Sequence, residues 1–291
     1  MNRAELVAAA GATIRQGSKS FHMASRLFDR RTRERAWLLY CWCRHCDDLC
    51  DGQALGHRSA DAPPPRPVAE LEEKTERVLA GESVGELPFD ALGAVLAECA
   101  IPHRYVRDHL RGFALDAAGW RPEDEADLIR YCYHVAGAVG CMMAVAMGVD
   151  PADEETLGRA SDLGIAFQLS NIARDVRDDH GAGRCYLPRS WVDLHGLDPD
   201  DPLRPDRRER LVALVARVCD LSLRYEASAR DGISRLPFRS RWAIHSAAGI
   251  YGRIGRRVAA LGPGAWERRV VVPRREKAAI MLGALKSAAS A

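Results

Sequence analysis

The chain has 291 residues, of which 47% are hydrophobic and 28% are charged. This composition is typical of a folded globular protein and excludes a disordered or low-complexity chain, and the length suffices for one large domain or two small ones. The 42 Lys and Arg residues nearly balance the 40 Asp and Glu residues, which leaves a formal charge of +2. So small a charge argues against the broad basic field of a nucleic-acid-binding protein, and we expect no nucleic-acid partner.

The cysteine content and the N-terminal segment favour a cytoplasmic protein. Nine cysteines are an odd number, and four of them lie within residues 41–50, which argues against the disulfide framework of a secreted protein. The first residues, MNRAELVAAAGATIRQGSKS, lack the apolar core and cleavage site of a signal peptide. The longest nearly uncharged apolar run, Val135–Val149, has 15 residues, fewer than the roughly 20 that span a membrane.

Helical periodicity dominates the chain from one end to the other, and the only strand-like fragment, Val270–Val272, is ended by Pro273. Segments rich in Pro, Gly and Asp, at residues 52–67 and 196–206, predict surface loops. Neither loop separates halves of different composition, so we expect a single all-α domain over residues 1–291. The periodicity predicts helices over residues 18–27, 31–51, 68–80, 88–99, 102–119, 124–148, 153–179, 206–232, 238–261 and 273–288.

Two helices each carry a stripe of polar side chains that ends in a pair of aspartates. In LLYCWCRHCDDLCDG, the residues Tyr40, Arg44, Asp47 and Asp51 are spaced by four, three and four, which places them on one helix face.

The segment GIAFQLSNIARDVRDDHG repeats this arrangement with Gln168, Asn171, Asp175 and Asp179, spaced by three, four and four. The sequence therefore predicts two acidic helix faces.

These aspartate pairs destabilise the helices that carry them. Like charges four residues apart cost about 0.2–0.5 kcal/mol. Each pair also precedes a glycine that is expected to end its helix, Gly52 or Gly181, and an anion in the last turn opposes the helix dipole by about 0.3–1 kcal/mol. A sequence that breaks these rules twice among apolar neighbours is expected to house a function there.

Oxygen ligands without His or Cys favour a hard divalent cation, and Mg²⁺ is commonly held by carboxylates together with substrate phosphates. We therefore expect Mg²⁺, with Mn²⁺ as an alternative, in a site between the two acidic faces. The competing interpretation is a pair of solvated helix ends, in which Arg44 pairs with Asp48 and Arg174 pairs with Asp178.

At these residues the chain resembles the squalene/phytoene synthase family, whose members join two prenyl diphosphates head to head. The first stripe resembles the D-D-x-x-D signature of the family, and QLSNIARDVRDDHGAGRCYLP is similar to its second acidic signature. With SKSFHMASRLFD, YCYHVAGAVG and RRVVVPRREK, the resemblance covers nearly the whole chain and is strongest to bacterial phytoene synthases. Cys50 and Asp178 depart from the commoner pattern, but neither is a proposed ligand.

The resemblance implies an isoprenoid-synthase-type helical bundle that encloses an apolar cavity, and it implies roles for individual residues. Asp47, Asp51, Asp175 and Asp179 match the metal-binding carboxylates. Tyr131, Arg44 and Asn171 match residues of the catalytic site, although core packing alone would also explain a single tyrosine. The substrate-binding positions of the family are matched by Lys19, Ser20, Tyr40, Arg44, Gln168, Asn171, Arg174, Tyr251 and Arg269.

The activity implied by the resemblance is the Mg²⁺-dependent coupling of two geranylgeranyl diphosphates, through a cyclopropyl diphosphate, to phytoene. No nicotinamide cofactor is expected, and Gly249, Gly252 and Gly255 do not match the dinucleotide fingerprint. Alternatives are a squalene or dehydrosqualene synthase that uses farnesyl diphosphate, a chain-elongating prenyltransferase or terpene cyclase, and a non-catalytic helical protein that binds anions or a partner. The chain length of the substrate, the proton acceptor and the oligomeric state stay open.

Three further features have simple interpretations. Cys41 and Cys43 diverge by about 200° on a helix, so the cysteines at 41–50 are expected to be ordinary buried thiols. The segment AVGCMMAVAMGV is expected to be a buried helix that also forms one wall of a prenyl tunnel. The C-terminal stretch REKAAIMLGALKSAASA is expected to pack against the bundle, with peripheral membrane contact as its second interpretation.

Overall fold

The computed structural model describes residues 1–51 and 68–290, with only the backbone of Asp51, and every regular element among them is a helix. The predicted loop at 52–67, including Gly52, lies outside the described residues. In chain order, the elements are α1 (Arg3–Gly17), α2 (Lys19–Ser25), α3 (Arg30–Asp51), α4 (Val68–Leu79), α5 (Leu87–Glu98), α6 (His103–Ala117), α7 (Glu125–Cys132), the π-helical η1 (Tyr133–Gly137), α8 (Ala138–Ala146), α9 (Glu154–Gly181), α10 (Arg189–Leu194), the 3₁₀ turn η2 (Pro205–Arg207), α11 (Arg208–Ile233), α12 (Phe238–Leu261), the 3₁₀ turn η3 (Gly262–Trp266) and α13 (Arg274–Ala289).

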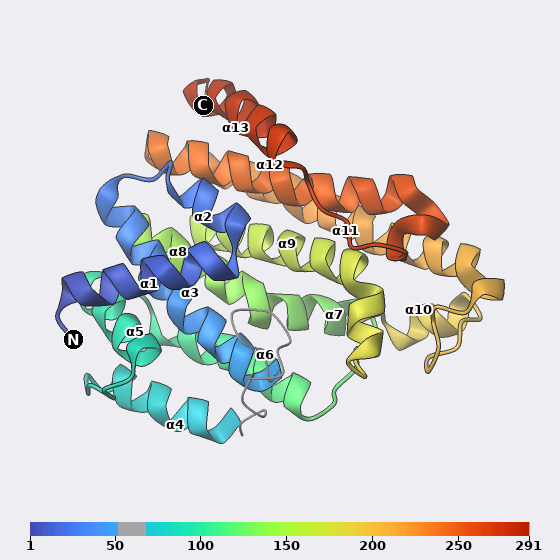
Figure 1. Ribbon diagram of the computed structural model, residues 1–291, viewed down its shortest axis with the longest axis horizontal. Helices are drawn as coiled ribbons and strands as arrows, with labels where there is room; N and C mark the ends of the chain where they lie inside the picture. Colours follow the sequence, from blue (N-terminus) through green and yellow to red (C-terminus); the bar gives the residue numbers. More distant parts are fainter. Residues whose placement is uncertain (52–67, 291) are drawn as a thin grey trace.

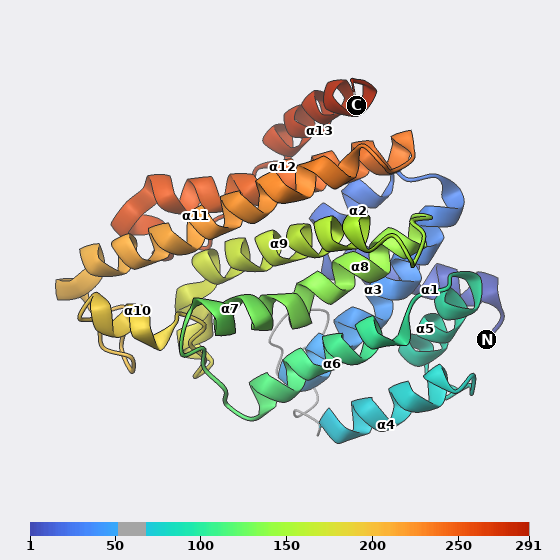
Figure 2. The same ribbon diagram turned by 180° about the vertical axis from the view of Figure 1, so that it is seen from behind.

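The helices form a layered bundle with α9 inside it. Figure 1 shows α13 on the outside, α12 and α11 beneath it, then α9, and finally α6 and α4 on the opposite side. Seen from behind in Figure 2, α9 lies between α11 on one side and α7 and α8 on the other. One apolar cluster joins α1, α3, α5, α6 and α8, and a second joins α7 and α9 to α11 and α12.

The all-α prediction is confirmed, and each predicted helix is present within two residues at both ends. Two helices were not predicted, α1 and the short α10. The start of α1 carries a capping box, in which the Asn2 side chain accepts from the Glu5 amide and the Glu5 carboxylate accepts from the Asn2 amide, both at 3.0 Å. This signal was present in the sequence.

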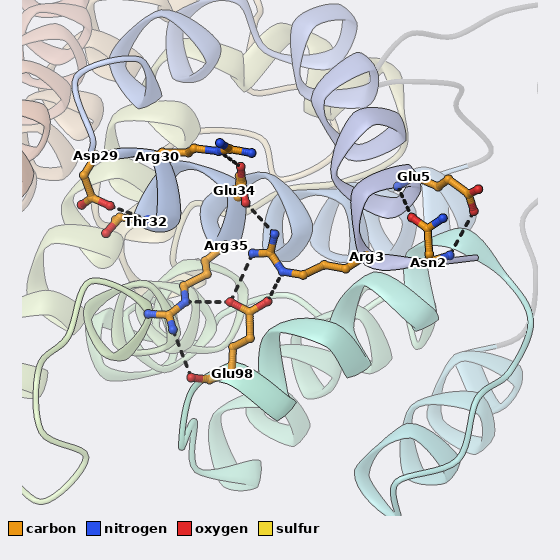
Figure 3. Close-up of polar contacts among 9 residues, drawn as sticks. All are labelled: Asn2, Arg3, Glu5, Asp29, Arg30, Thr32, Glu34, Arg35 and Glu98. Carbon is orange, nitrogen blue, oxygen red and sulfur yellow. Dashed lines mark hydrogen bonds and ion pairs between the residues drawn. The ribbon is translucent and has the colours of Figure 1, made fainter.

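An ion-pair network fastens α1 to the bundle, as Figure 3 shows. Arg3 donates to Glu34 of α3 at 2.6 Å and to Glu98 at the end of α5 at 2.5 Å. Arg35 of α3 donates to the same Glu98 carboxylate at 3.1 Å. Glu98 therefore joins three helices that lie far apart in the sequence.

The predicted helix over 124–148 is one continuous rod, but a π-helical turn, η1, interrupts its α-helical hydrogen bonding. This rod packs against α9 with backbone in contact. A Cβ on Gly164 of α9 would lie 2.2 Å from the Ala136 carbonyl oxygen, and a Cβ on Gly140 of α8 would lie 2.2 Å from the Ala160 carbonyl oxygen. The glycines are required because no side chain fits between these helices.

The same rod bears on the expectation that no segment could span a membrane. Glu125–Ala146 is 22 residues long and contains an 18-residue apolar window with a mean hydropathy of 1.3, so by length and composition it is long and apolar enough to span a membrane. The expectation from the apolar run alone is therefore wrong by that measure, because it did not include the N-terminal half of the rod. Half of the apolar window is buried inside the bundle, as is typical of a core helix.

The contact at Gly164 predicts an overpacking effect. Gly164→Ala should destabilise the protein by about 1–3 kcal/mol or more, because the added methyl meets a backbone carbonyl that cannot move aside. Gly158→Ala, in the same helix but with open space around its Cβ position, should stabilise by up to about 1 kcal/mol. The melting temperatures of the two variants measure the difference. A Gly164→Ala variant that melts at the wild-type temperature would refute the close contact.

Candidate active site

A cavity of about 1000 Å³ lies between the two apolar clusters. Twelve of the fourteen site residues predicted from the sequence line it. They are Ser20, Tyr40, Arg44, Asp47, Tyr131, Gln168, Asn171, Arg174, Asp175, Asp179, Tyr251 and Arg269. Lys19 is exposed at the start of α2 and does not line the cavity, and the side chain of Asp51 lies outside the described residues.

The stripe on α3 is held together by Arg44. Its Nε donates to the Tyr40 hydroxyl at 3.2 Å, and its Nη1 donates to the Asp47 carboxylate. Burial opposes the charge on Arg44, but Asp47 and Tyr40 outweigh it and raise the pKa of the guanidinium. Gly17 of α1 makes room for the phenol, since a Cβ there would lie 2.7 Å from the Tyr40 hydroxyl oxygen.

The stripe on α9 is held by two arginines. Arg174 donates two hydrogen bonds to the Asp175 carboxylate, one from Nε at 2.7 Å and one from Nη2. Arg269, from the segment that precedes α13, donates to the same carboxylate at 3.2 Å. One turn before Asp175 on α9, Asn171 donates to the side-chain oxygen of Gln168 at 3.5 Å.

The competing interpretation, solvated helix ends with i,i+4 ion pairs, is wrong for α9 and minor for α3. Arg174 pairs with the adjacent Asp175, whereas Arg44 pairs closely with Asp47 and approaches Asp48 only to 4.0 Å. Both arginines therefore face the cavity beside the predicted aspartates.

Among the aspartates that line the cavity, Asp179 has a strongly raised pKa. Burial and the neighbouring Asp175 raise the pKa of Asp179 to about 8, and Arg184 only partly offsets them. In the metal-free protein this carboxyl is thus largely protonated at neutral pH. A cation bound beside it would favour the ionised form.

A carboxylate that the sequence did not reveal lies next to this set. Asp116, near the end of α6, accepts from the Tyr131 hydroxyl at 2.9 Å and from the Tyr186 hydroxyl at 2.8 Å. Trp120, Tyr131 and Tyr186 stack with ring centroids 5.6 and 4.7 Å apart. Because the Tyr131 proton points to Asp116, the position of this phenol is set by a residue outside both acidic stripes.

The only sequence signal for Asp116 is its place on α6 in one stripe with His109 and Phe113, which also line the cavity. Tyr186 lies in the GRCYLP segment, where no residue was assigned a role.

A second residue missed from the sequence is Lys277 of α13. Its Nζ donates to the Ser20 hydroxyl at 2.5 Å, so a lysine does stand beside the cavity, but it is not the predicted Lys19. Burial and Arg274 lower the pKa of Lys277.

Apolar side chains form most of the remaining cavity wall. Val139, Met143 and Met147 line it from α8 and the residue after it, while Ala138 and Met142 of the same segment are buried in the core. The segment AVGCMMAVAMGV is therefore a buried helix, as predicted, and it also forms one wall of the cavity, whereas its role in holding a prenyl chain stays a prediction. Tyr251 stacks on Phe167 with the ring centroids 4.1 Å apart, between the polar end and this apolar wall.

The thiols near the site keep their protons at neutral pH in the metal-free protein. Cys43 lines the cavity, and burial raises the pKa of its thiol to about 12. Cys41 and Cys46 are buried in the core cluster. Within residues 1–51 and 68–290, as far as their side chains are described, no three His, Cys, Asp or Glu side chains are already gathered at metal-binding distances.

Residues 14–276 match the sequence profile of the family described as "Squalene/phytoene synthase". The chain is 44% identical to the 15-cis-phytoene synthase of Pantoea ananas over 287 residues, which cover 98% of this chain and 92% of that one. It is also 44% identical to the 15-cis-phytoene synthase of Enterobacter agglomerans over 272 residues, covering 92% and 91% of the two chains.

The structure is similar to solved members of the same fold. A dehydrosqualene synthase in complex with ligand superposes with a TM-score of 0.88 at 26% identity, covering 99% of this chain and 98% of that one. A squalene synthase from Alicyclobacillus acidocaldarius gives 0.75 at 23% identity, covering 89% and 95%. Sequence, fold and the residues that line the cavity agree, and the chain belongs to the squalene/phytoene synthase family of prenyltransferases.

Proposed function

We propose that the protein couples two geranylgeranyl diphosphates head to head to form phytoene, a reaction of carotenoid biosynthesis. One observation carries the proposal: the cavity has carboxylates and arginines at one end and a mostly apolar wall along the rest of its length. That arrangement fits a substrate with a diphosphate head and a long hydrocarbon tail. The identity to curated bacterial phytoene synthases supports the twenty-carbon substrate.

The residues at the polar end fit a hard divalent cation. Asp47 faces the cavity from α3, while Asp175 and Asp179 face it from α9, so the donor set consists of carboxylate oxygens. These three side chains, with Asp51, would hold Mg²⁺ or Mn²⁺ together with the diphosphate of the substrate. When bound, the cation supplies Lewis-acid stabilisation of the departing diphosphate.

The arginines supply positive charge at the same place. Arg44, Arg174 and Arg269 surround the acidic residues and present guanidinium groups to the cavity. Guanidinium groups bind diphosphate oxygens bidentately and stabilise the charge that develops when the carbon–oxygen bond breaks. The first diphosphate then leaves, and the 2,3-alkene of the second substrate attacks the allylic cation.

Proton loss from that adduct gives the cyclopropyl diphosphate, which ionises again, rearranges and loses a second proton to give phytoene. The released diphosphate and a tyrosine are the candidate proton acceptors. Tyr131 is the tyrosine best placed by its contacts, since Asp116 fixes the orientation of its phenol at the polar end. The apolar wall excludes water, which would otherwise capture the cations.

The proposed location is the cytoplasm, with peripheral contact at a membrane surface, because substrate and product are long hydrocarbons. On α13, Ala284 and Ala288 are buried, while Leu282 is 66% exposed beside the cationic Lys286. One exposed leucine with nearby cations supports a weak surface contact.

The product distinguishes the proposed activity from its alternatives. With Mg²⁺, geranylgeranyl and farnesyl diphosphates supplied in competition should give mainly a forty-carbon hydrocarbon, and NADPH should not change it, because phytoene forms by proton loss. Mass spectrometry of the extracted hydrocarbon makes the measurement.

A thirty-carbon main product would replace phytoene synthase with squalene or dehydrosqualene synthase. A requirement for isopentenyl diphosphate would indicate chain elongation, and absence of diphosphate release would indicate a non-catalytic binding protein.

The raised pKa of Asp179 predicts opposite effects on stability and activity. Asp179→Asn should reduce turnover by about 100-fold or more, because a ligand is lost from the charged site. In metal-free buffer the same variant should melt above the wild type, because above about pH 4 the wild-type carboxyl is ionised in the unfolded chain and must take up a proton on folding. The gain should grow from about pH 4 to about pH 8, the folded-state pKa, and then level off.

Glu155→Gln provides the control, because Glu155 lies in the exposed first turn of α9 and pairs with Arg235 outside the cavity. The Glu155→Gln variant should have the turnover of the wild type and the same pH dependence of the melting temperature. Full activity of Asp179→Asn would show that Asp179 is not a required metal ligand.

A further inference from the structure

The deep end of the cavity lies at the start of α9. The cavity follows this helix from Asp175 at the polar end, past Leu163, to Arg159 and to Thr156 in the next turn. Arg159 lies sixteen residues before Asp175, and a rise of 1.5 Å per residue makes the distance between them along the helix about 24 Å. The space for the prenyl tail is therefore limited by what stands near Arg159.

Two other helices finish at this deep end. Met147, the residue after α8, lines it from one side, and Gly232 and Ile233 in the last turn of α11 line it from another. Figure 2 shows α11 and α9 side by side along their length, with the α11 to α12 turn beyond them. The ends of three helices thus surround one opening, and Arg159 is the cationic side chain that lines the cavity there.

The Arg159 side chain lies across this opening. A Cβ on Gly232 would lie 2.6 Å from the Arg159 Cβ and 3.0 Å from its Cγ, so the aliphatic stem covers the glycine directly. The guanidinium reaches the surface, where Nη1 donates to the Ser228 hydroxyl at 2.5 Å and Nη2 lies 3.9 Å from Asp231. The side chain is 35% exposed.

The anchor of the guanidinium is itself fixed. Ser228 donates to Asp162 at 2.5 Å, so a short hydrogen-bonded chain ties Arg159 on α9 to α11 and back to α9. A long cationic side chain commonly lies this way, with its methylenes on apolar surface and its charge in water. Here the methylenes form the boundary between the cavity and the solvent.

We propose that the Arg159 side chain closes the deep end of the cavity and sets the longest prenyl chain that the enzyme accepts. This inference rests on the proposed function and assigns a specificity-determining residue to it. A tail longer by one isoprene unit must displace the stem and separate the guanidinium from Ser228. Removing the stem opens the cavity at its end and lets the longer tail pass.

The test is a competition between geranylgeranyl diphosphate and its twenty-five-carbon homologue, geranylfarnesyl diphosphate, with hydrocarbon products separated by mass. The quantity measured is the ratio of kcat/KM for the two substrates in one sample. This ratio does not depend on the folded fraction of the enzyme, so a destabilised variant still gives an answer. Arg159→Ala should raise the relative use of the longer substrate about tenfold or more.

Two matched variants separate closure by the stem from loss of charge. Arg159→Met keeps an unbranched stem without the guanidinium, and its ratio should stay within about threefold of wild type. Arg224→Ala removes an exposed cation that lies one turn before Ser228 on α11, pairs with Glu125 and does not line the cavity, and its ratio should be unchanged.

An unchanged ratio in Arg159→Ala would overturn the inference. Equal rises in Arg159→Ala and Arg159→Met would also overturn it, because they would mean that the charge closes the end. An equal rise in Arg224→Ala would overturn it as well, because it would mean that the bundle loosens in general. If the wild type forms no forty-carbon product from geranylgeranyl diphosphate alone, the proposed function fails instead, and that result is read before any variant is compared.

Discussion

The arrangement of the molecule depends on α9 running unbroken along the whole cavity. One helix face carries aspartates and an arginine near its C-terminal end, apolar residues in the middle and Arg159 near its start. This order can serve a single substrate only if α7 and α8 stay against α9, and the backbone contacts at Gly140 and Gly164 hold them there. The ionic and apolar parts of the cavity are therefore positioned by one rigid element.

The polar end is electrostatically costly without a ligand. Asp175 and Asp179 lie four residues apart, near the negative end of the α9 dipole, and burial raises the pKa of Asp179 to about 8. Arg174 and Arg269 offset part of this cost at Asp175. A divalent cation and a diphosphate, the two groups that the proposed reaction requires, would offset the remaining electrostatic cost.

The helices and the two acidic faces could be predicted from the sequence, because both depend on the spacing of residues that are near one another in the chain. The helix bounds and the two aspartate stripes follow from residues three and four apart. The role of Asp116 depends on contacts with Tyr131 and Tyr186, 15 and 70 residues away, which no local pattern encodes. Lys277 replaces Lys19 beside Ser20 for the same reason, since α13 and α2 meet only in the fold. The deep end of the cavity also could not be predicted, because it is formed by the ends of α8 and α11 together with the start of α9. The helix α1 could have been predicted, because its capping box is a local sequence pattern.

We propose that the two acidic faces form one site for a diphosphate and a divalent cation. The most direct measurement is the melting temperature of the wild-type protein with Mg²⁺ alone, with inorganic diphosphate alone, and with both. A ligand that binds only the folded state stabilises it, so the two together should raise the melting temperature by more than the sum of their separate effects. Millimolar concentrations of both that leave the melting temperature unchanged would contradict the claim.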